Sequence, residues 1–226
     1  MSQPGKVLLM VGSPKGEKST SNSIASYISR KFSENHVEVE KTYIVKDIRS
    51  KKSIDRLILK INDSDILILV SPLYVDSIPA IAIKAMEKIH ENKNNSVEKK
   101  QMMAIFNCGF PEPHHNDLAI DMCKKFASLS GIMWAGSVTI GMGASLEGRS
   151  LDNFGMAKNL RNGLDMAVNA LANGNAVPKE AEIISSKPLM PISIAKFVMC
   201  TFGGIMWGNQ MDKQAKKKMY DRPYGL

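Results

Sequence analysis

The chain has 226 residues, of which 44% are hydrophobic and 23% charged, the balance of a globular protein with a sizeable core. A formal net charge of +8 suits anionic small molecules, nucleic acid or an anionic membrane surface, and chooses none of them. The cysteines, Cys108, Cys123 and Cys200, form no CxxC pair, which argues against a zinc or iron–sulfur site and favours a reducing compartment. Because the first apolar run is too short for a signal-peptide core, we expect a cytoplasmic protein with no bound metal.

Short apolar runs and helical stripes alternate along the first 175 residues. Strands are predicted at Lys6–Val11 and at residues 37–40, 65–70, 102–106 and 132–140. Apolar residues at helical spacing follow each strand: Ile24, Ile28 and Phe32; Ile54, Leu57, Ile58 and Ile61; Ile81, Ala85, Met86 and Ile89; Leu118, Met122, Phe126 and Leu129; Ala157, Leu160, Leu164, Ala167 and Leu171.

This alternation predicts an α/β fold with helices on both faces of a parallel sheet. Five repeats favour a flavodoxin-like, doubly wound five-stranded sheet of order 2-1-3-4-5. Ligands of such sheets bind beyond the carboxyl ends of the strands. The loops at residues 12–21, 71–76 and 107–115 are therefore the candidate binding loops, and all three are rich in Gly, Pro or small polar residues.

The pattern changes after Gly174. Residues 178–186 are mixed in character, and residues 192–207 are almost all apolar, with Lys196 as their only charge. That run is shorter than the roughly 20 residues of a membrane span. We therefore predict a binding domain at residues 1–175 and a helical C-terminal extension at 176–226. The apolar run is expected to pack against the domain or a second subunit; the alternative is a weak membrane-surface contact supported by the Lys-rich tail.

The first candidate loop, VGSPKGEKSTSNS at residues 11–23, has the composition of a phosphate site. It is one residue away from the triphosphate loop G-x-x-x-x-G-K-[ST], because Glu17 stands where the second Gly belongs. Triphosphate-hydrolysing proteins also carry a metal-holding Asp after a strand, where this chain has Ser71 and Asn107. Both departures argue against a triphosphate.

A monophosphate requires less of this loop. Four hydroxyl side chains and one cation are available, together with the amides at the start of the following helix: Ser13, Ser19, Thr20, Ser21 and Lys15. The alternative is a helix whose hydroxyl residues serve only as caps. Four hydroxyls and a Lys crowded after one strand favour the anion site.

Three motifs in order resemble those of the flavodoxin-like NAD(P)H-dependent FMN reductases. GSPK at 12–15 with STS at 19–21 resembles their phosphate loop, SPLYVDSIP at 71–79 their second flavin loop, and NCGFPE at 107–112 the loop after their fourth strand. The resemblance covers residues 5 to about 175. It implies that the FMN phosphate is held by Ser13, Lys15, Ser19, Thr20 and Ser21, that Pro72, Leu73 and Tyr74 lie along the flavin and ribityl chain, and that Asn107, Cys108 and Gly109 present backbone to the ring's other side.

The resemblance further implies an FMN-dependent oxidoreductase. NADH or NADPH would give hydride to the flavin, which would pass it to a small acceptor such as a quinone, a nitroaromatic, an azo compound or free flavin. Because the flavin carries the chemistry, no catalytic side chain is expected. The alternative is an FMN electron carrier of the flavodoxin type, against which the net charge and the extension argue. A homodimer is expected, and no nucleic-acid partner.

Two further features have simple interpretations. Cys108 is expected to be a small residue near the ring edge, because no His-Asp partner pattern supports a nucleophile. The adjacent His114 and His115 are expected to face solvent.

Overall fold

The computed structural model describes residues 4–92, 100–146 and 148–191, and residues 193, 194, 197 and 201. Its centre is a parallel sheet with the strand order β2-β1-β3-β4-β5, which confirms the predicted topology. The strands are β1 (Lys6–Val11), β2 (Glu38–Tyr43), β3 (Ile66–Pro72), β4 (Gln101–Asn107) and β5 (Met133–Ile140).

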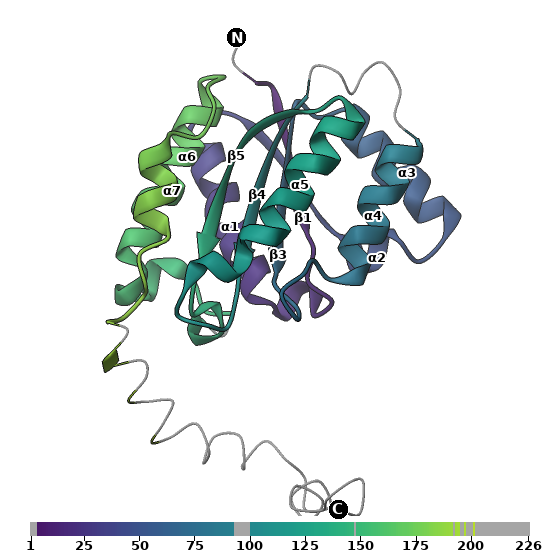
Figure 1. The fold of residues 1–226 in the computed structure, drawn as a ribbon. Coiled ribbons are helices and arrows are strands. Elements are labelled where there is room, and N and C mark those ends of the chain that lie inside the picture. The colour runs from purple at the N-terminus through teal and green to yellow at the C-terminus, as the bar shows by residue number, and fades with distance from the viewer. Residues whose placement is uncertain are drawn as a thin grey trace, which may run out of the picture. The chain divides into compact units, whose positions relative to one another are not determined.

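Helices cover both faces of this sheet (Figure 1). One face packs against α1 (Thr20–Glu34) and α6 (Lys158–Ala172). The other packs against α2 (Ile44–Asp47), α3 (Lys51–Asn62), α4 (Ala80–Glu91) and α5 (Asp117–Ser130). Short 3-10 helices shape the connections: η1 (Gly16–Lys18), η3 (Pro113–Asn116), η4 (Gly143–Leu146), η5 (Leu151–Asn153) and η6 (Gly155–Ala157).

The central strands are apolar on both sides because each side chain faces one of two cores. In β1, Val7, Leu9 and Val11 join the core under α1 and α6, whereas Leu8 and Met10 join the core under the opposite helices. This period of two is the geometry of a pleated strand. It explains why the central strands are continuous apolar runs rather than alternating ones.

The helix α5 is confirmed, but its predicted apolar stripe is not the face that is buried. Leu118 and Leu129 are 58% and 53% exposed, and only Phe126 of the stripe is buried. The buried face consists mainly of smaller residues: Ala119, Ile120, Cys123, Ala127 and Ser130. The largest apolar residues therefore do not mark the core face of this helix.

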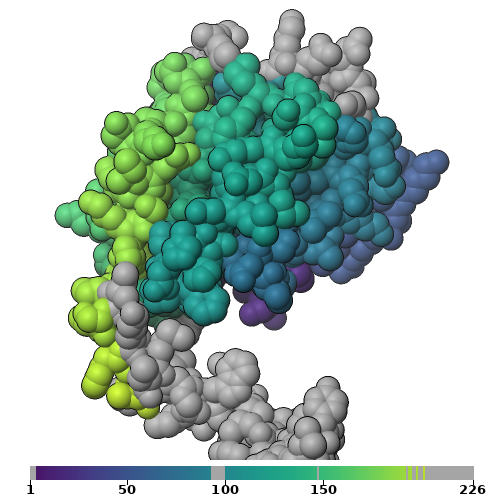
Figure 2. Space-filling view, in the orientation of Figure 1, coloured from purple at the N-terminus to yellow at the C-terminus, as the bar shows by residue number. Residues whose placement is uncertain are grey.

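Helix α7 (Lys179–Ser185), within the segment predicted as mixed, packs against α6 and β5. Its Glu182 carboxylate accepts hydrogen bonds from the Ser137 amide (3.0 Å) and hydroxyl (3.1 Å). The amide of Val177 donates to the Ala135 carbonyl at 2.7 Å. These contacts satisfy polar groups on the outer edge of β5, an edge strand. Figure 2 shows α7 beside α5 on the surface, with a groove of about 410 Å³ between them.

The chain divides into two compact units, residues 1–189 and 190–226. Most of the predicted apolar run at 192–207 lies outside the described residues; Ile194 and Phe197, which are described, are exposed. The predicted domain boundary near residue 175 stays a prediction. Among the residues that the structure describes, no helix has the length and apolar character needed to span a membrane.

Candidate functional site

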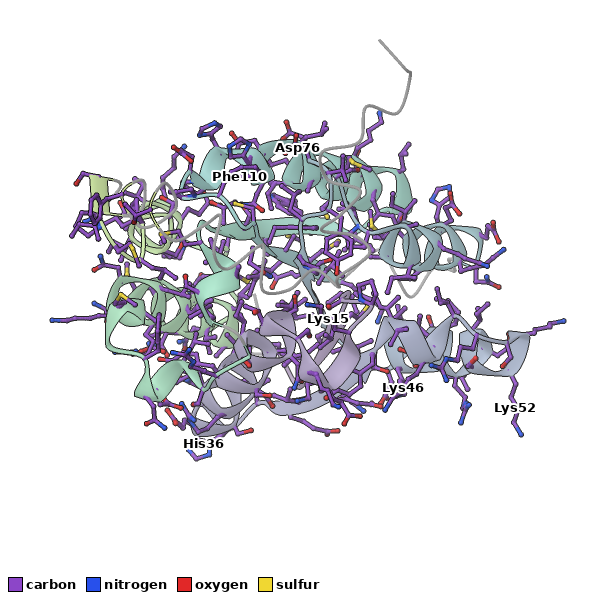
Figure 3. All side chains as sticks on the ribbon, turned by 90° about the horizontal axis from the view of Figure 1, so that it is seen from below. Lys15, His36, Lys46, Lys52, Asp76 and Phe110 are labelled. Atoms are coloured by element: carbon purple, nitrogen blue, oxygen red, sulfur yellow. The ribbon has the colours of Figure 1, made fainter. Side chains whose placement is uncertain are left out.

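All the predicted site residues line one cavity at the carboxyl ends of β1, β3 and β4. This strand-end cavity has a volume of about 420 Å³, within the range of roughly 300–1,000 Å³ typical of small-molecule sites. Its lining residues are Ser13, Lys15, Lys18, Ser19, Thr20, Ser21, Pro72, Leu73, Tyr74, Asn107, Cys108, Gly109, Ala144 and Gly148. The topology therefore brings three loops that are far apart in sequence to one place (Figure 3).

The first loop leaves β1 through Gly12, where only glycine fits. A Cβ at this position would lie 2.8 Å from Ser71 Oγ and 2.9 Å from Ser71 Cβ. The Gly12 amide donates to the Val70 carbonyl at 2.8 Å, which holds the start of the loop against β3. Close approach of these two strand ends places the loop across the end of the sheet.

The hydroxyl of Ser19 is committed to the start of α1. It donates to the Gly16 carbonyl at 2.6 Å and accepts from the Asn22 amide at 3.1 Å, as an N-cap does. Its hydrogen is therefore already used. The capping alternative from the sequence is correct for this one residue, which lines the cavity but acts locally as a cap.

Within the described chain, two other hydroxyls accept a hydrogen bond but donate none. Ser13 Oγ accepts from the Lys15 amide at 3.3 Å, and Ser21 Oγ accepts from Asn107 Nδ2 at 3.2 Å. Both serines are buried. Thr20 Oγ1 donates to the Gly143 carbonyl at 3.3 Å, which is long for a hydroxyl hydrogen bond. These three hydroxyls can donate to an anion with little loss of existing bonds.

The first turn of α1 also has free backbone donors. The amides of Asn22 and Ser23 both donate to Ser19. Those of Thr20 and Ser21 have no recorded partner in the part of the chain that the structure describes. Such amides, at the positive end of the helix dipole, attract an anion.

The charges around this turn also favour an anion. Lys15 and Lys18 line the cavity with exposed side chains. Glu17 is not among the lining residues; its carboxylate pairs with Lys46 at 2.6 Å, and this ammonium lowers the pKa of Glu17. The end of the cavity nearest α1 is therefore positive, with hydroxyl and amide donors suited to a phosphate dianion.

Asn107 joins the second and third loops to the first. Its Nδ2 donates to the Ser71 carbonyl at 3.1 Å and to Ser21 Oγ at 3.2 Å, and its own carbonyl accepts from the Leu73 amide at 2.8 Å. The side chain is buried, so these bonds are shielded from water. Asn107 therefore fixes the spacing between the ends of β3 and β4.

Cys108 and Gly109 form a wall of low polarity beside Asn107. The Cys108 thiol is buried and donates weakly to the carbonyls of Phe110 (3.5 Å) and Glu112 (3.6 Å). Burial raises the pKa of this thiol, which keeps it protonated and disfavours a nucleophilic role. A Cβ built at Gly109 would meet no atom within 4 Å, so open space adjoins this residue.

An aromatic cluster follows Gly109, the last lining residue of the third loop. The His115 ring lies 4.6 Å from the Phe110 ring and 4.7 Å from the His114 ring, measured between centroids. His115 Nδ1 lies 3.7 Å from Asp76 Oδ1 in the turn after Tyr74. Figure 3 shows Asp76 and Phe110 on one side of this end of the sheet, with Lys15 nearer α1. His114 is exposed, as predicted, whereas His115 is half-buried between the rings of His114 and Phe110.

Three lining residues were not predicted. Lys18 stands in the same loop as Lys15, and its charge was a signal that could have identified it. Ala144 and Gly148 come from the loop after β5, whose carboxyl end meets the same edge of the sheet. No motif marks these two positions. Among the described residues, no group of three or more His, Cys, Asp or Glu could hold a metal ion.

The sheet order and the strand-end cavity define a flavodoxin-like α/β protein. Three solved structures share this fold. An NADH:FMN oxidoreductase (EMOB, apo form) is 12% identical, with a TM-score of 0.58, over 84% of this chain and 98% of that one. An FMN-dependent NADH-azoreductase from Bacillus anthracis, in complex with FMN, is 16% identical (TM-score 0.56, 74% and 100% covered). An NADPH-quinone reductase from P. pentosaceus is 17% identical (TM-score 0.53, 74% and 97% covered).

The family assignment comes from the sequence. The model of the NADPH-dependent FMN reductase family matches residues 5–143, more than half of the chain, and the chain belongs to this family. A search of curated proteins gave no match. Family membership confirms the predicted flavin class, with FMN as the cofactor and NAD(P)H as the electron donor. The cavity fits such a group, because it pairs a positive, donor-rich end with a wall of low polarity.

Proposed function

We propose that the protein binds FMN in the strand-end cavity and uses it to pass hydride from NADH or NADPH to a small acceptor. The observation that carries this proposal is the convergence of all three predicted loops on one cavity of suitable size. When bound, FMN supplies the two-electron chemistry, and the protein binds, orients and shields it.

The phosphate is assigned to the first turn of α1. The hydroxyls of Ser13, Thr20 and Ser21 donate to it, as do the amides of Thr20 and Ser21. Lys15 and Lys18 supply positive charge, whereas Ser19 holds the turn in shape through its bond to the Gly16 carbonyl. Charge-assisted bonds of this kind are roughly twice as strong as neutral ones.

The ring is assigned to the other end of the cavity. Pro72, Leu73 and Tyr74 line one side and Asn107, Cys108 and Gly109 the other. Asn107 sets the distance between these two walls through its bonds to Ser71 and Leu73. The wall groups are mainly backbone and apolar side chain, which suits the face of an aromatic ring.

No acid–base pair is assigned to the protein. The titratable side chains among the described lining residues are Lys15, Lys18, Tyr74 and Cys108; neither a carboxylate nor an imidazole is among them. Hydride transfer through a flavin needs no such pair. The acceptors we propose are planar aromatic or quinonoid compounds, because Tyr74, which lines the cavity, and Phe110, which follows the lining residue Gly109, are both exposed.

Oxidation of NAD(P)H tests this proposal against the electron-carrier alternative. Protein saturated with FMN should oxidise NADH or NADPH with a quinone, nitroaromatic, azo compound or free flavin as acceptor, in multiple turnovers. FMN binding without such turnover would favour a flavodoxin-type carrier. No FMN binding would refute the site itself.

We also propose a homodimer located in the cytoplasm. The dimer rests on the resemblance of the chain to its family, and the compartment on the free thiols of Cys108 and Cys123 in the part of the chain that the structure describes. Light scattering of the purified full chain would give the mass in solution, and a monomer would exclude the dimer.

A further inference from the structure

An excess of positive charge lies on the outward side of α2, α3 and the turn between them. Five of the eight exposed residues between positions 46 and 59 are cations, and only Asp55 is an acid. The cations, which we call the basic face, are Lys46, Arg49, Lys51, Lys52 and Arg56. These eight residues together carry a charge of +4, half the formal net charge of the chain. Figure 1 shows α2 and α3 beside each other, and Figure 3 shows Lys46 and Lys52 along one edge of the domain.

Most cations of the basic face have no ion-pair partner. In the part of the chain that the structure describes, no carboxylate lies at ion-pair distance from Arg49, Lys51, Lys52 or Arg56. Lys46 pairs with Glu17, but both side chains are more than half exposed, so this pair is weak. Several cations on α1, α4 and α5 do pair with acids: Arg30, Lys31, Lys88 and Lys124. The charge of the basic face is therefore available to an anionic partner.

The placement of two of these cations is unfavourable for α3 itself. Lys51 and Lys52 are the first two residues of the helix, and no acid lies in its first turn. The amides at a helix N-terminus carry partial positive charge, so cations at this end lower the stability of the helix. The helix start is stabilised instead by a capping box between Ser50 and Ser53, with hydrogen bonds of 3.0 and 3.2 Å. A local arrangement that opposes stability in this way is typical of a functional surface.

An apolar side chain lies on the same side of α3 as the cations. Leu59 is 66% exposed and follows Asp55 by one helical turn, whereas Leu57 and Ile61 are buried. At a lipid surface, Lys and Arg place their charges among the headgroups while an apolar neighbour enters the boundary below them. A nucleic acid offers no such apolar layer, and none of the eight exposed residues is an aromatic that could stack on bases. The composition therefore favours a lipid surface.

We propose that the basic face is a contact surface for an anionic lipid membrane. Its charge attracts the anionic headgroups, and Leu59 enters their apolar boundary. The inference goes beyond the proposed function and does not depend on it, because none of the five cations lines the strand-end cavity. It is also separate from the C-terminal extension. Such a contact holds the protein at the layer in which apolar acceptors such as quinones dissolve.

Co-sedimentation with lipid vesicles tests the proposal. At low salt, the full chain should bind vesicles made of phosphatidylcholine and phosphatidylglycerol in equal parts, and added salt should release it. Binding to vesicles of phosphatidylcholine alone should be at least about tenfold weaker. A triple variant of α3, with Lys51→Gln, Lys52→Gln and Arg56→Gln, should bind the anionic vesicles at least about tenfold more weakly, because each cation near such a surface contributes about fivefold.

A second triple variant is the matched control. Lys84→Gln, Lys125→Gln and Lys158→Gln remove the same charge from exposed positions of α4, α5 and α6, and should weaken vesicle binding less than about threefold. The α3 variant should also keep the Tm of the unaltered protein or exceed it, because two of its changes remove charges that oppose the helix dipole. Weaker binding by the α3 variant is then not caused by unfolding.

A single substitution separates lipid from other polyanions. Leu59→Gln should weaken binding to the anionic vesicles at least about threefold and leave the binding of a DNA duplex unchanged. Equal losses in the two triple variants would overturn the proposal, because net charge alone would then explain the binding. Unchanged binding by the α3 variant would assign the contact to the C-terminal extension and would also overturn it. So would tighter binding of the unaltered chain to the duplex than to the vesicles, or no vesicle binding.

Discussion

Replacing Thr20 by Val should separate phosphate binding from folding. The two side chains have nearly the same shape, so the change removes a hydroxyl and little else. In the protein alone, that hydroxyl makes one long bond of 3.3 Å to the Gly143 carbonyl, and the residue is only partly buried. Its loss should cost less than about 1 kcal/mol of folding free energy, or a fall in Tm of less than about 4 °C.

The effect on FMN should be larger. A hydrogen bond to a charged group contributes about 1.5–3 kcal/mol, which corresponds to roughly a 10- to 150-fold change in affinity. Flavin fluorescence titration of the apoprotein would measure Kd for FMN and for riboflavin, which lacks the phosphate. Thr20→Val should weaken FMN binding by at least tenfold and riboflavin binding by less than threefold.

Ser19→Ala is the matched control from the same turn. Its hydroxyl caps α1 and is already bonded to Gly16, so its loss should cost about 1 kcal/mol of stability and lower Tm by about 2–4 °C. FMN affinity under native conditions should change less than threefold. An unchanged FMN affinity in Thr20→Val, or an equal loss for riboflavin, would refute the assignment of this hydroxyl to the phosphate.

Three further predictions concern a glycine of the cavity wall, a strained residue after Tyr74 and the buried cysteines Cys108 and Cys123. The Gly109→Leu variant should fold normally, because a Cβ there meets nothing within 4 Å, but it should no longer bind FMN. The control is Gly155→Leu, at an equally open position outside the cavity, which should bind FMN as the unaltered protein does. Equal FMN affinities of the two variants would refute the ring assignment. Val75→Asn should raise the free energy of unfolding, measured by urea denaturation, by about 1 kcal/mol, because a β-branched residue at φ 48° is strained. A free energy of unfolding below that of the unaltered protein would indicate that Val75 is covered in the assembled protein. Burial raises the pKa of Cys108 and raises that of Cys123 to about 12. At pH 7 both thiols should therefore be alkylated more slowly than a free thiol, and Cys123 more slowly than Cys108. Bound FMN should slow the alkylation of Cys108 but not that of Cys123, which peptide mass spectrometry would measure.

The sequence predicted the sheet and the site because both depend on local signals. Continuous apolar runs marked the strands, their regular alternation with helical stripes gave the order 2-1-3-4-5, and that order brings the loops after β1, β3 and β4 together. Each predicted lining residue lies at the end of β3 or β4, in a loop that follows β1, β3 or β4, or at the start of α1.

The features that the sequence did not predict depend on tertiary contacts. The inward face of α5 carries Ala119 and Ala127, whereas Leu118 and Leu129 are exposed, so the size of the apolar residues did not indicate which face packs on the sheet. The short helix α7 is held by packing on α6 and β5. The Ser19 hydroxyl is unavailable as a donor to a ligand because it donates to the carbonyl of Gly16. None of these arrangements produces a periodic pattern of apolar residues in the sequence.

The most direct test of the account is the affinity of the unaltered apoprotein for FMN relative to riboflavin. The two ligands share the ring and ribityl chain and differ in the phosphate alone. The strand-end cavity, with its hydroxyls, free amides and two lysines, predicts that FMN binds at least tenfold more tightly and that added salt narrows the difference. Equal affinities for the two flavins would contradict the account, as would no measurable binding of either.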